Sequence, residues 1–222
     1  MTDNQGMSLD QLELLKKMKA IASDLWGGPD GSLPAEEENE AEPSAAPEAP
    51  KAAGKERKNY RNLWKTADET IDWTDALAHP TPTDQLTGQR LWSFFHKHAA
   101  KVLAGDLGAY TEVLKASNPL GELTDFAEGI NIRAVSPDRL ESSFVCLEDH
   151  MGKDRKTYLA AMGIRIARDL LACLPVSEVT VTGEYDGKPV FTATYPRKQM
   201  LHRNFNFVDP VAFSEECGAD FG

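Results

Sequence analysis

Residues 154–196, DRKTYLAAMGIRIARDLLACLPVSEVTVTGEYDGKPVFTATYP, decide the fold of this chain. The first half predicts a helix that Pro175 ends, because its apolar residues recur at the spacing of one helix face: Tyr158, Leu159, Met162, Ile166, Leu170, Cys173 and Leu174. Arg165 and Arg168 lie outside that face. Two alternating, β-branched runs then flank Asp186 and Gly187, a pair typical of a two-residue hairpin turn. We therefore expect a long helix followed by an antiparallel pair of strands.

The residues upstream predict two more helices and a second hairpin. Thr81 and Pro82 suit the start of one helix, and Asp106 suits the cap of the next. Residues 130–134 and 140–147 alternate between apolar and polar types on either side of a turn. The resulting order predicts an α+β domain in which a helical hairpin precedes a β-β-α-β-β, mainly antiparallel sheet with helices on one face.

Composition excludes several classes of protein. The chain has 222 residues, 41% of them hydrophobic, which is enough for a core and excludes wholesale disorder. No apolar run approaches the ~18 residues that cross a bilayer, and the first residues lack the pattern of a secretory signal. Three widely spaced cysteines fit reduced thiols. We therefore expect a cytoplasmic protein.

The net charge of -11 is distributed unevenly along the chain. Residues 29–50 carry seven acidic and no basic side chains, and residues 51–65 carry six basic and one acidic. The acidic run is rich in Glu, Ala and Pro and has too little apolar surface to offset the entropy cost of ordering it. This predicts three parts: a helix within residues 1–26, an acidic-then-basic flexible linker over 27–65, and a globular domain over 66–222.

The N-terminal helix is predicted by a capping box at Ser8 and Gln11 and by glycines at its end. One half of its surface is almost entirely apolar, a pattern typical of a helix that binds a groove. The partner-binding residues predicted on this face are Leu12, Leu15, Met18, Leu25 and Trp26. The face could dock on its own domain, on a partner protein or on a second copy. A membrane surface is less favoured because the Lys and acidic residues of this helix balance.

The basic segment suggests a second kind of partner. Cationic side chains interleaved with aromatic rings can neutralise phosphates and stack on bases. The candidate nucleic-acid residues are Arg57, Lys58, Tyr60, Arg61, Trp64 and Lys65. The alternative, which the near balance of charge favours, is neutralisation by the acidic run or the acidic domain of the same chain.

No motif predicts a catalytic residue, a metal site or a cofactor. Glycine-rich nucleotide loops, GxSxG and HExxH are absent from the sequence. His96 and His98 lie on different sides of a predicted helix and cannot chelate one ion. Glu148 and Asp138 resemble a nuclease metal pair, but the strand between them would separate them by about 30 Å. A hydrolase with an unrecognised site would need Glu148, His150 or His98 to meet in a pocket.

The stretches KVLAGDLGAYTEVLKASNPL (101–120), IRIARDLLACLPVSEVTVTG (164–183), the Pro196-Arg197 pair and NFNFVDPVAF (204–213) resemble a C-terminal α/β module of uncharacterised Firmicutes proteins. The resemblance spans about Leu91 to Phe213. In such proteins the module follows different N-terminal parts, which implies a bacterial interaction or regulatory module and transfers no catalytic residue.

The leading hypothesis is therefore a cytosolic interaction, adaptor or regulatory protein that acts through a tethered amphipathic helix. The first alternative is a nucleic-acid-associated regulatory, mobile-element or defence protein that uses residues 51–65. The second alternative is the hydrolase with an unrecognised site.

Overall fold

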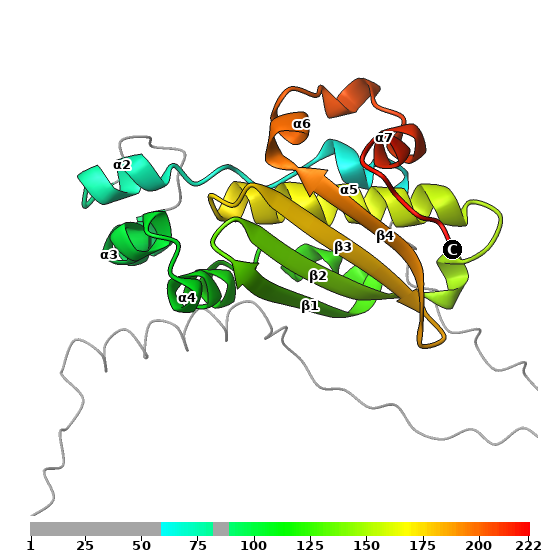
Figure 1. The fold of residues 1–222 in the computed structure, drawn as a ribbon, viewed down its shortest axis with the longest axis horizontal. Helices are drawn as coiled ribbons and strands as arrows, with labels where there is room; N and C mark the ends of the chain where they lie inside the picture. Colours follow the sequence, from blue (N-terminus) through cyan, green and yellow to red (C-terminus); the bar gives the residue numbers. More distant parts are fainter. Residues whose placement is uncertain (1–58, 82–88) are drawn as a thin grey trace, which may run out of the picture. The chain divides into compact units, whose positions relative to one another are not determined.

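The computed structural model describes residues 59–81 and 89–222 of the chain (Figure 1). The predicted helix of residues 1–26 and the linker up to residue 58 lie outside the described residues. The strands are β1 (Ala127–Ser136), β2 (Arg139–Cys146), β3 (Glu178–Tyr185) and β4 (Lys188–Pro196). The α-helices are α2 (Trp73–Ala78), α3 (Gln89–Leu103), α4 (Leu107–Ser117), α5 (Arg155–Cys173), α6 (Arg197–Leu201) and α7 (Pro210–Glu216). Four short 3-10 helices connect them: η1 (Tyr60–Lys65), η2 (Gly121–Asp125), η3 (Glu148–His150) and η4 (Phe205–Phe207).

The four strands form one sheet in the order β1-β2-β3-β4. The two predicted hairpins are present, since β1 pairs with β2 and β3 pairs with β4 in antiparallel fashion. The α+β class is confirmed, but the sheet is mixed because β2 and β3 are parallel. Their connection runs through α5, which carries the chain back along the sheet before β3 begins (Figure 1).

The turn between β3 and β4 has the predicted geometry. Asp186 has φ 52° and Gly187 has φ 68°, so both central residues are left-handed. A two-residue turn of this kind matches the twist of the flanking strands.

The hydrophobic core lies between α5 and one face of the sheet. Phe144, Val181 and Tyr195 point from the strands into it and are fully buried. Gly163 lets α5 approach β4, because a Cβ atom there would lie only 2.6 Å from the hydroxyl of Tyr195. On its other sides α5 contacts η1 and α7, so it is buried along most of its length.

The opposite face of the sheet is polar. It carries Arg133, Glu141, Thr180 and Thr194, which the strand register places side by side. The outer edge of β4 is partly covered, since the backbone of Thr192 pairs with Asp220 near the C-terminus.

The folded body begins earlier than the predicted boundary at residue 66. The helix η1 packs against α5, and Trp64 is only 8% exposed. The last six residues of the predicted linker therefore belong to the packed domain. Within the part of the chain that the structure describes, no helix is long and apolar enough to cross a membrane.

Candidate functional site: an arginine-lined pocket

Residues 66–72, here called the strap, join η1 to α2 and lie along the C-terminal half of α5. The backbone N–H of Asp68 donates to the carboxylate of Asp169 at 2.9 Å. The N–H of Ile71 donates to the carbonyl of Ala172, also at 2.9 Å. These two bonds fix an irregular segment beside a helix and create the wall of a pocket.

A buried ion pair lies behind the strap. Arg165 Nε donates to Asp169 Oδ2 at 2.6 Å, and their side chains are 6% and 0% exposed. The carboxylates of Asp68 and Glu122 each lie 3.6 Å from Arg165 Nη2. Burial raises the pKa of Asp169 to about 6, against the opposing hydrogen bonds from Arg165 and from the Asp68 backbone. One guanidinium is therefore shared by three acidic side chains, and its contacts with Asp169 and Asp68 anchor the strap.

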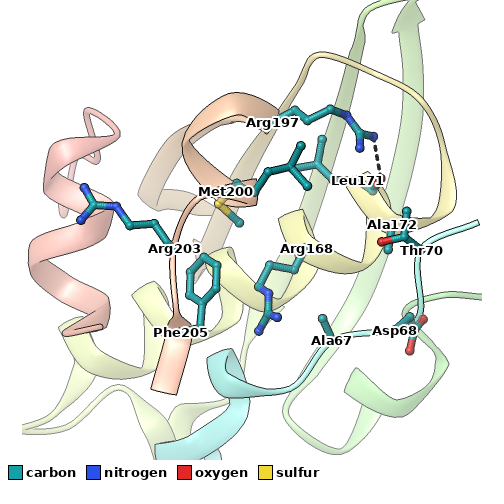
Figure 2. A pocket seen from close by; sticks show the side chains of 11 residues that line it. Ala67, Asp68, Thr70, Arg168, Leu171, Ala172, Arg197, Met200, Arg203 and Phe205 are labelled. Atoms are coloured by element: carbon teal, nitrogen blue, oxygen red, sulfur yellow. Dashed lines mark hydrogen bonds between the residues drawn. The ribbon is translucent and has the colours of Figure 1, made fainter. Parts of the chain in front are cut away.

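The pocket opens between the strap, the C-terminal half of α5, α6 and the segment that follows α6 (Figure 2). Its volume is about 210 Å³. Three arginines from different parts of the chain line it: Arg168, Arg197 and Arg203. Apolar side chains, among them Met200 and Phe205, and the strap residues Asp68 and Thr70 complete the lining. We call this hollow the arginine pocket.

Arg168 is held by η1, by the strap and by an aromatic ring. Its Nη1 donates to the carbonyls of Trp64 at 2.6 Å and of Thr66 at 3.1 Å. Its guanidinium carbon lies 4.3 Å from the centroid of the Phe205 ring, which is the geometry of a cation–π contact. Within the described residues, Nε and Nη2 make no hydrogen bond, so their N–H groups are available to a ligand.

Arg197 caps the C-terminal end of α5. Its Nε donates to the carbonyl of Val176 at 2.6 Å, and its Nη2 donates to the carbonyls of Leu171 at 2.6 Å and Leu174 at 2.5 Å. A cation at this position satisfies carbonyls that the helix leaves unpaired. Nη1 has no hydrogen-bond partner among the described residues.

Arg203 lies nearer the solvent. It pairs with the exposed carboxylate of Glu216, and its guanidinium lies 5.5 Å from the Phe213 ring centroid. Because this contact is at the surface, Arg203 contributes little to stability. It is therefore the best position for separating binding from folding.

Arg168 and Arg197 form no ion pair with the described residues, although the carboxylate of Asp169 acts on Arg168 from a greater distance. Neither guanidinium lies within 4 Å of a carboxylate in the described parts of the chain. Burial lowers the pKa of both groups, because partial desolvation penalises a charge that carbonyls compensate only in part. The two guanidiniums point in different directions (Figure 2), and the N–H groups of each that are unpaired among the described residues suit an anionic group such as a carboxylate or a phosphate.

The predicted nucleic-acid residues mainly hold η1 on the domain. The Trp64 indole N–H donates to the carbonyl of Val208 at 3.2 Å, and its ring is buried. The Tyr60 ring lies edge-on to Tyr158, with 5.5 Å between ring centroids. These contacts occupy the rings that the hypothesis assigns to base stacking.

The remaining members of that set have similar local roles or lie outside the described residues. Arg61 pairs with Asp154 at 3.1 Å, and Lys65 lies 5.6 Å from the Trp64 ring centroid. Arg57 and Lys58 precede the described residues, as do the predicted partner-binding side chains Leu12, Leu15, Met18, Leu25 and Trp26.

The acid–base candidates have separate surroundings. His98 is buried between Phe94 and Glu112, whereas the ring of His150 contacts Tyr60 and Tyr158. The whole of β2 separates the position of Glu148 from the turn before that strand. In residues 59–81 and 89–222, no group of three or more His, Cys, Asp or Glu side chains is arranged to hold a metal ion.

Comparisons of the chain with protein-family models, with curated proteins and with solved structures find no match.

The arginine pocket was not predicted from the sequence. Its only sequence signal is a pair of arginines, Arg165 and Arg168. They lie off the apolar face of a helix whose other residues are mostly buried. Arg197 belongs to a Pro-Arg pair that carried the resemblance but suggested no role.

Proposed function

We propose that this protein is a bacterial cytosolic binding module, of adaptor or regulatory type, whose folded domain recognises an anionic group in the arginine pocket. The observation that supports this most is the hydrogen-bond inventory of Arg168 and Arg197. Both are partly buried, both lack a carboxylate partner among the described residues, and both keep unused N–H groups at the same pocket. Desolvated cations of this kind bind anions more strongly than exposed ones.

The test is thermal unfolding of the full chain with and without small anions at constant ionic strength. We would titrate succinate and inorganic phosphate against a chloride reference, because the two anions distinguish carboxylate from phosphate recognition. A ligand present at ten times its Kd adds about 1.4 kcal/mol to the free energy of unfolding. For a domain of this size this raises Tm by about 3–5 °C.

Two variants separate site binding from general salt effects. Arg203→Gln removes a pocket cation without disturbing α5, and we expect it to reduce the increase in Tm by at least half. Arg133→Gln is the matched control, since Arg133 is a 75% exposed cation on the polar face of the sheet, paired with Glu141. Equal increases in all three proteins would refute the proposal.

The N-terminal helix supplies the second half of the proposed function, which is recruitment of a protein partner through Leu12, Leu15, Met18, Leu25 and Trp26. Its support is the width of the apolar face predicted for these residues. The experiment changes Leu15 and Met18 to Asp and compares the size of the complexes formed by the full chain in lysate and after purification. Unchanged assembly would eliminate the recruitment role.

The nucleic-acid alternative gains no support from the packing of Tyr60 and Trp64. The polar face of the sheet offers no substitute, because it presents Glu141, Glu178 and Glu184 among its cations. Titration of labelled single-stranded DNA at two salt concentrations tests this alternative directly. Salt-sensitive binding that Arg61→Gln weakens would revive it.

A further inference from the structure

A second hollow adjoins the arginine pocket. The two share three lining residues, Thr70, Leu171 and Arg197. The second hollow has a volume of about 360 Å³ and lies between the strap, the end of α3 and the end of α5. Arg197 stands at the junction, where its position is fixed by three carbonyl groups.

The two hollows differ in chemistry. The second is lined mainly by apolar groups, including Ile71, Leu103, Leu174 and Pro175, and we call it the apolar hollow. Its one acidic residue, Asp72, is occupied as the cap of α2, where its carboxylate accepts from the N–H groups of Thr74 and Asp75. A ligand that spans both hollows would therefore meet an excess of cations at one end, where three arginines face one acidic residue, and an apolar surface at the other.

Large apolar side chains are exposed beside both hollows. Leu103 is 44% exposed at the end of α3, and Leu201 is 65% exposed at the end of α6. Between them, the hydroxyl of Thr70 makes no hydrogen bond to the described residues and can bind a peptide group. Arginine, methionine and aromatic residues beside exposed leucines are typical of protein interfaces.

Charge indicates the class of occupant. The chain carries a net charge of -11, yet three arginines and one acidic residue, Asp68, line the arginine pocket. Asp68 lies 3.6 Å from Arg165, and among the three lining arginines only Arg203 pairs with a carboxylate in the described residues, that of Glu216. A nucleic acid would feel the repulsion of the whole acidic protein, whereas a short peptide contacts only the local cations. An acidic peptide is complementary to the arginine pocket.

We propose that the two hollows form one docking groove for an extended acidic peptide of a partner protein, with a carboxylate in the arginine pocket and an apolar side chain in the apolar hollow. This inference rests on the proposed function, because it requires that the arginine pocket bind an anion. To the proposed function it adds the class of ligand, an acidic peptide, and the direction in which that peptide would lie along the strap.

The experiment measures fluorescence anisotropy of a labelled synthetic peptide, Gly-Glu-Glu-Leu-Glu-Leu-Gly, titrated with the full chain. Two control peptides replace every Glu by Gln or every Leu by Ala. We expect both controls to bind at least five times more weakly than the parent peptide. Raising the salt concentration should weaken the parent peptide and leave the Gln peptide unchanged.

Protein variants then test each hollow separately. Leu103→Gln changes an exposed residue of the apolar hollow, so we expect a five- to tenfold loss of peptide affinity with unchanged affinity for succinate. Arg203→Gln should lower both affinities. Val135→Gln is the matched control, since Val135 is 41% exposed on β1 and does not line either hollow; it should change neither.

The outcomes distinguish this inference from the proposed function. If succinate binds but the Leu and Ala peptides bind equally, the groove is refuted while the anion site stands. If phosphate binds but neither succinate nor the peptide does, the groove is refuted while the anion site stands. If succinate, phosphate and the peptide all fail to bind, both proposals are refuted. If the peptide binds only after Glu36, Glu37, Glu38, Glu40 and Glu42 are changed to Gln, the occupant is the chain's own acidic run. If the chain sediments as a dimer that Leu103→Gln dissociates, the occupant is a second copy. Either of the last two results overturns the partner peptide.

Discussion

Replacement of Gly163 by alanine tests the closest contact between α5 and the sheet. The added Cβ would lie 2.6 Å from Tyr195 Oη and 2.7 Å from Phe191 Cε1. Both rings are buried, so neither can move into solvent. The Tyr195 hydroxyl is also held by the hydroxyl of Ser214 at 2.9 Å. The substitution must therefore displace the helix, a ring or this hydrogen bond.

The expected change in the free energy of unfolding is the sum of two destabilising effects and one stabilising effect. Overpacking in a close-packed core costs about 1–3 kcal/mol. Disturbing the hydrogen bond between Tyr195 and Ser214 adds about 1 kcal/mol. Alanine returns about 1 kcal/mol because it is a better helix former than glycine. We therefore expect Gly163→Ala to lower the free energy of unfolding by about 2 kcal/mol.

The assay is equilibrium unfolding in urea, followed by tryptophan fluorescence and far-UV circular dichroism. With a urea dependence of about 2 kcal/mol per molar, the midpoint should fall by about 1 M. Gly152→Ala is the matched control, because a Cβ at Gly152 meets no atom within 4 Å. Tyr195→Phe removes the oxygen that the new methyl group meets, so Gly163→Ala should cost less in that background. A Gly163→Ala protein as stable as wild type would refute the close packing.

Three further predictions concern the pH dependence, the hairpin and η1. The free energy of unfolding should fall as pH rises from about 4 to 6, because Asp169 binds its proton more tightly in the folded state, with a pKa of about 6, than in the unfolded state. In Asp169→Asn the free energy of unfolding, measured in urea at several pH values, should not show this fall. Parallel pH profiles for wild type and the variant would contradict the raised pKa of Asp169. Gly187→Ala should cost about 1 kcal/mol in thermal unfolding, because its φ of 68° is left-handed; no loss would contradict the turn geometry. Trp64→Ala should cost about 3 kcal/mol or more, whereas Phe207→Ser, at an 88% exposed side chain, should change stability by less than about 0.5 kcal/mol. Equal effects of the last two would show that η1 is not packed as described.

The elements that were predicted correctly are those whose signals are local. Asp106 accepts from the N–H of Ala109 as the cap of α4, and Asn118 ends that helix in a left-handed conformation. The Asp186-Gly187 turn specifies its own hairpin through two positive φ angles. In each case neighbouring residues determine the geometry, so a short stretch of sequence is sufficient.

The parallel pairing of β2 with β3 and the position of η1 depend on contacts far apart in the sequence. The alternation of each strand indicates that one face is buried, but it is the same whether the neighbouring strand is parallel or antiparallel. Trp64 resembled an exposed ring in a charged segment, yet Val208, 144 positions later, accepts its N–H. Periodicity within one segment contains no information about such partners.

The same limit explains why the arginine pocket was missed. Arg165 and Arg168 lie off the apolar face of α5, which predicts exposure when the helix has one buried side. In the folded chain η1 and the strap cover that second side, so Arg165 is buried against Asp169 and Arg168 donates to one carbonyl of η1 and one of the strap. A polar residue on the outer face of a helix is exposed only if nothing else packs there.

Stability and binding are linked at this pocket, since the groups that would hold an anion also hold the domain together. Arg197 satisfies three carbonyls near the end of α5, and Arg168 holds η1 and the start of the strap on that helix. Removing either would therefore lower the free energy of unfolding and lose ligand affinity at once, and neither loss would identify the cause. Arg203, whose contact with Glu216 is exposed, lacks this double role. A ligand that binds only the folded state must raise the free energy of unfolding by an amount that its Kd determines. Agreement between that increase and a directly measured Kd, in wild type and in Arg203→Gln, would assign the effect to the arginine pocket.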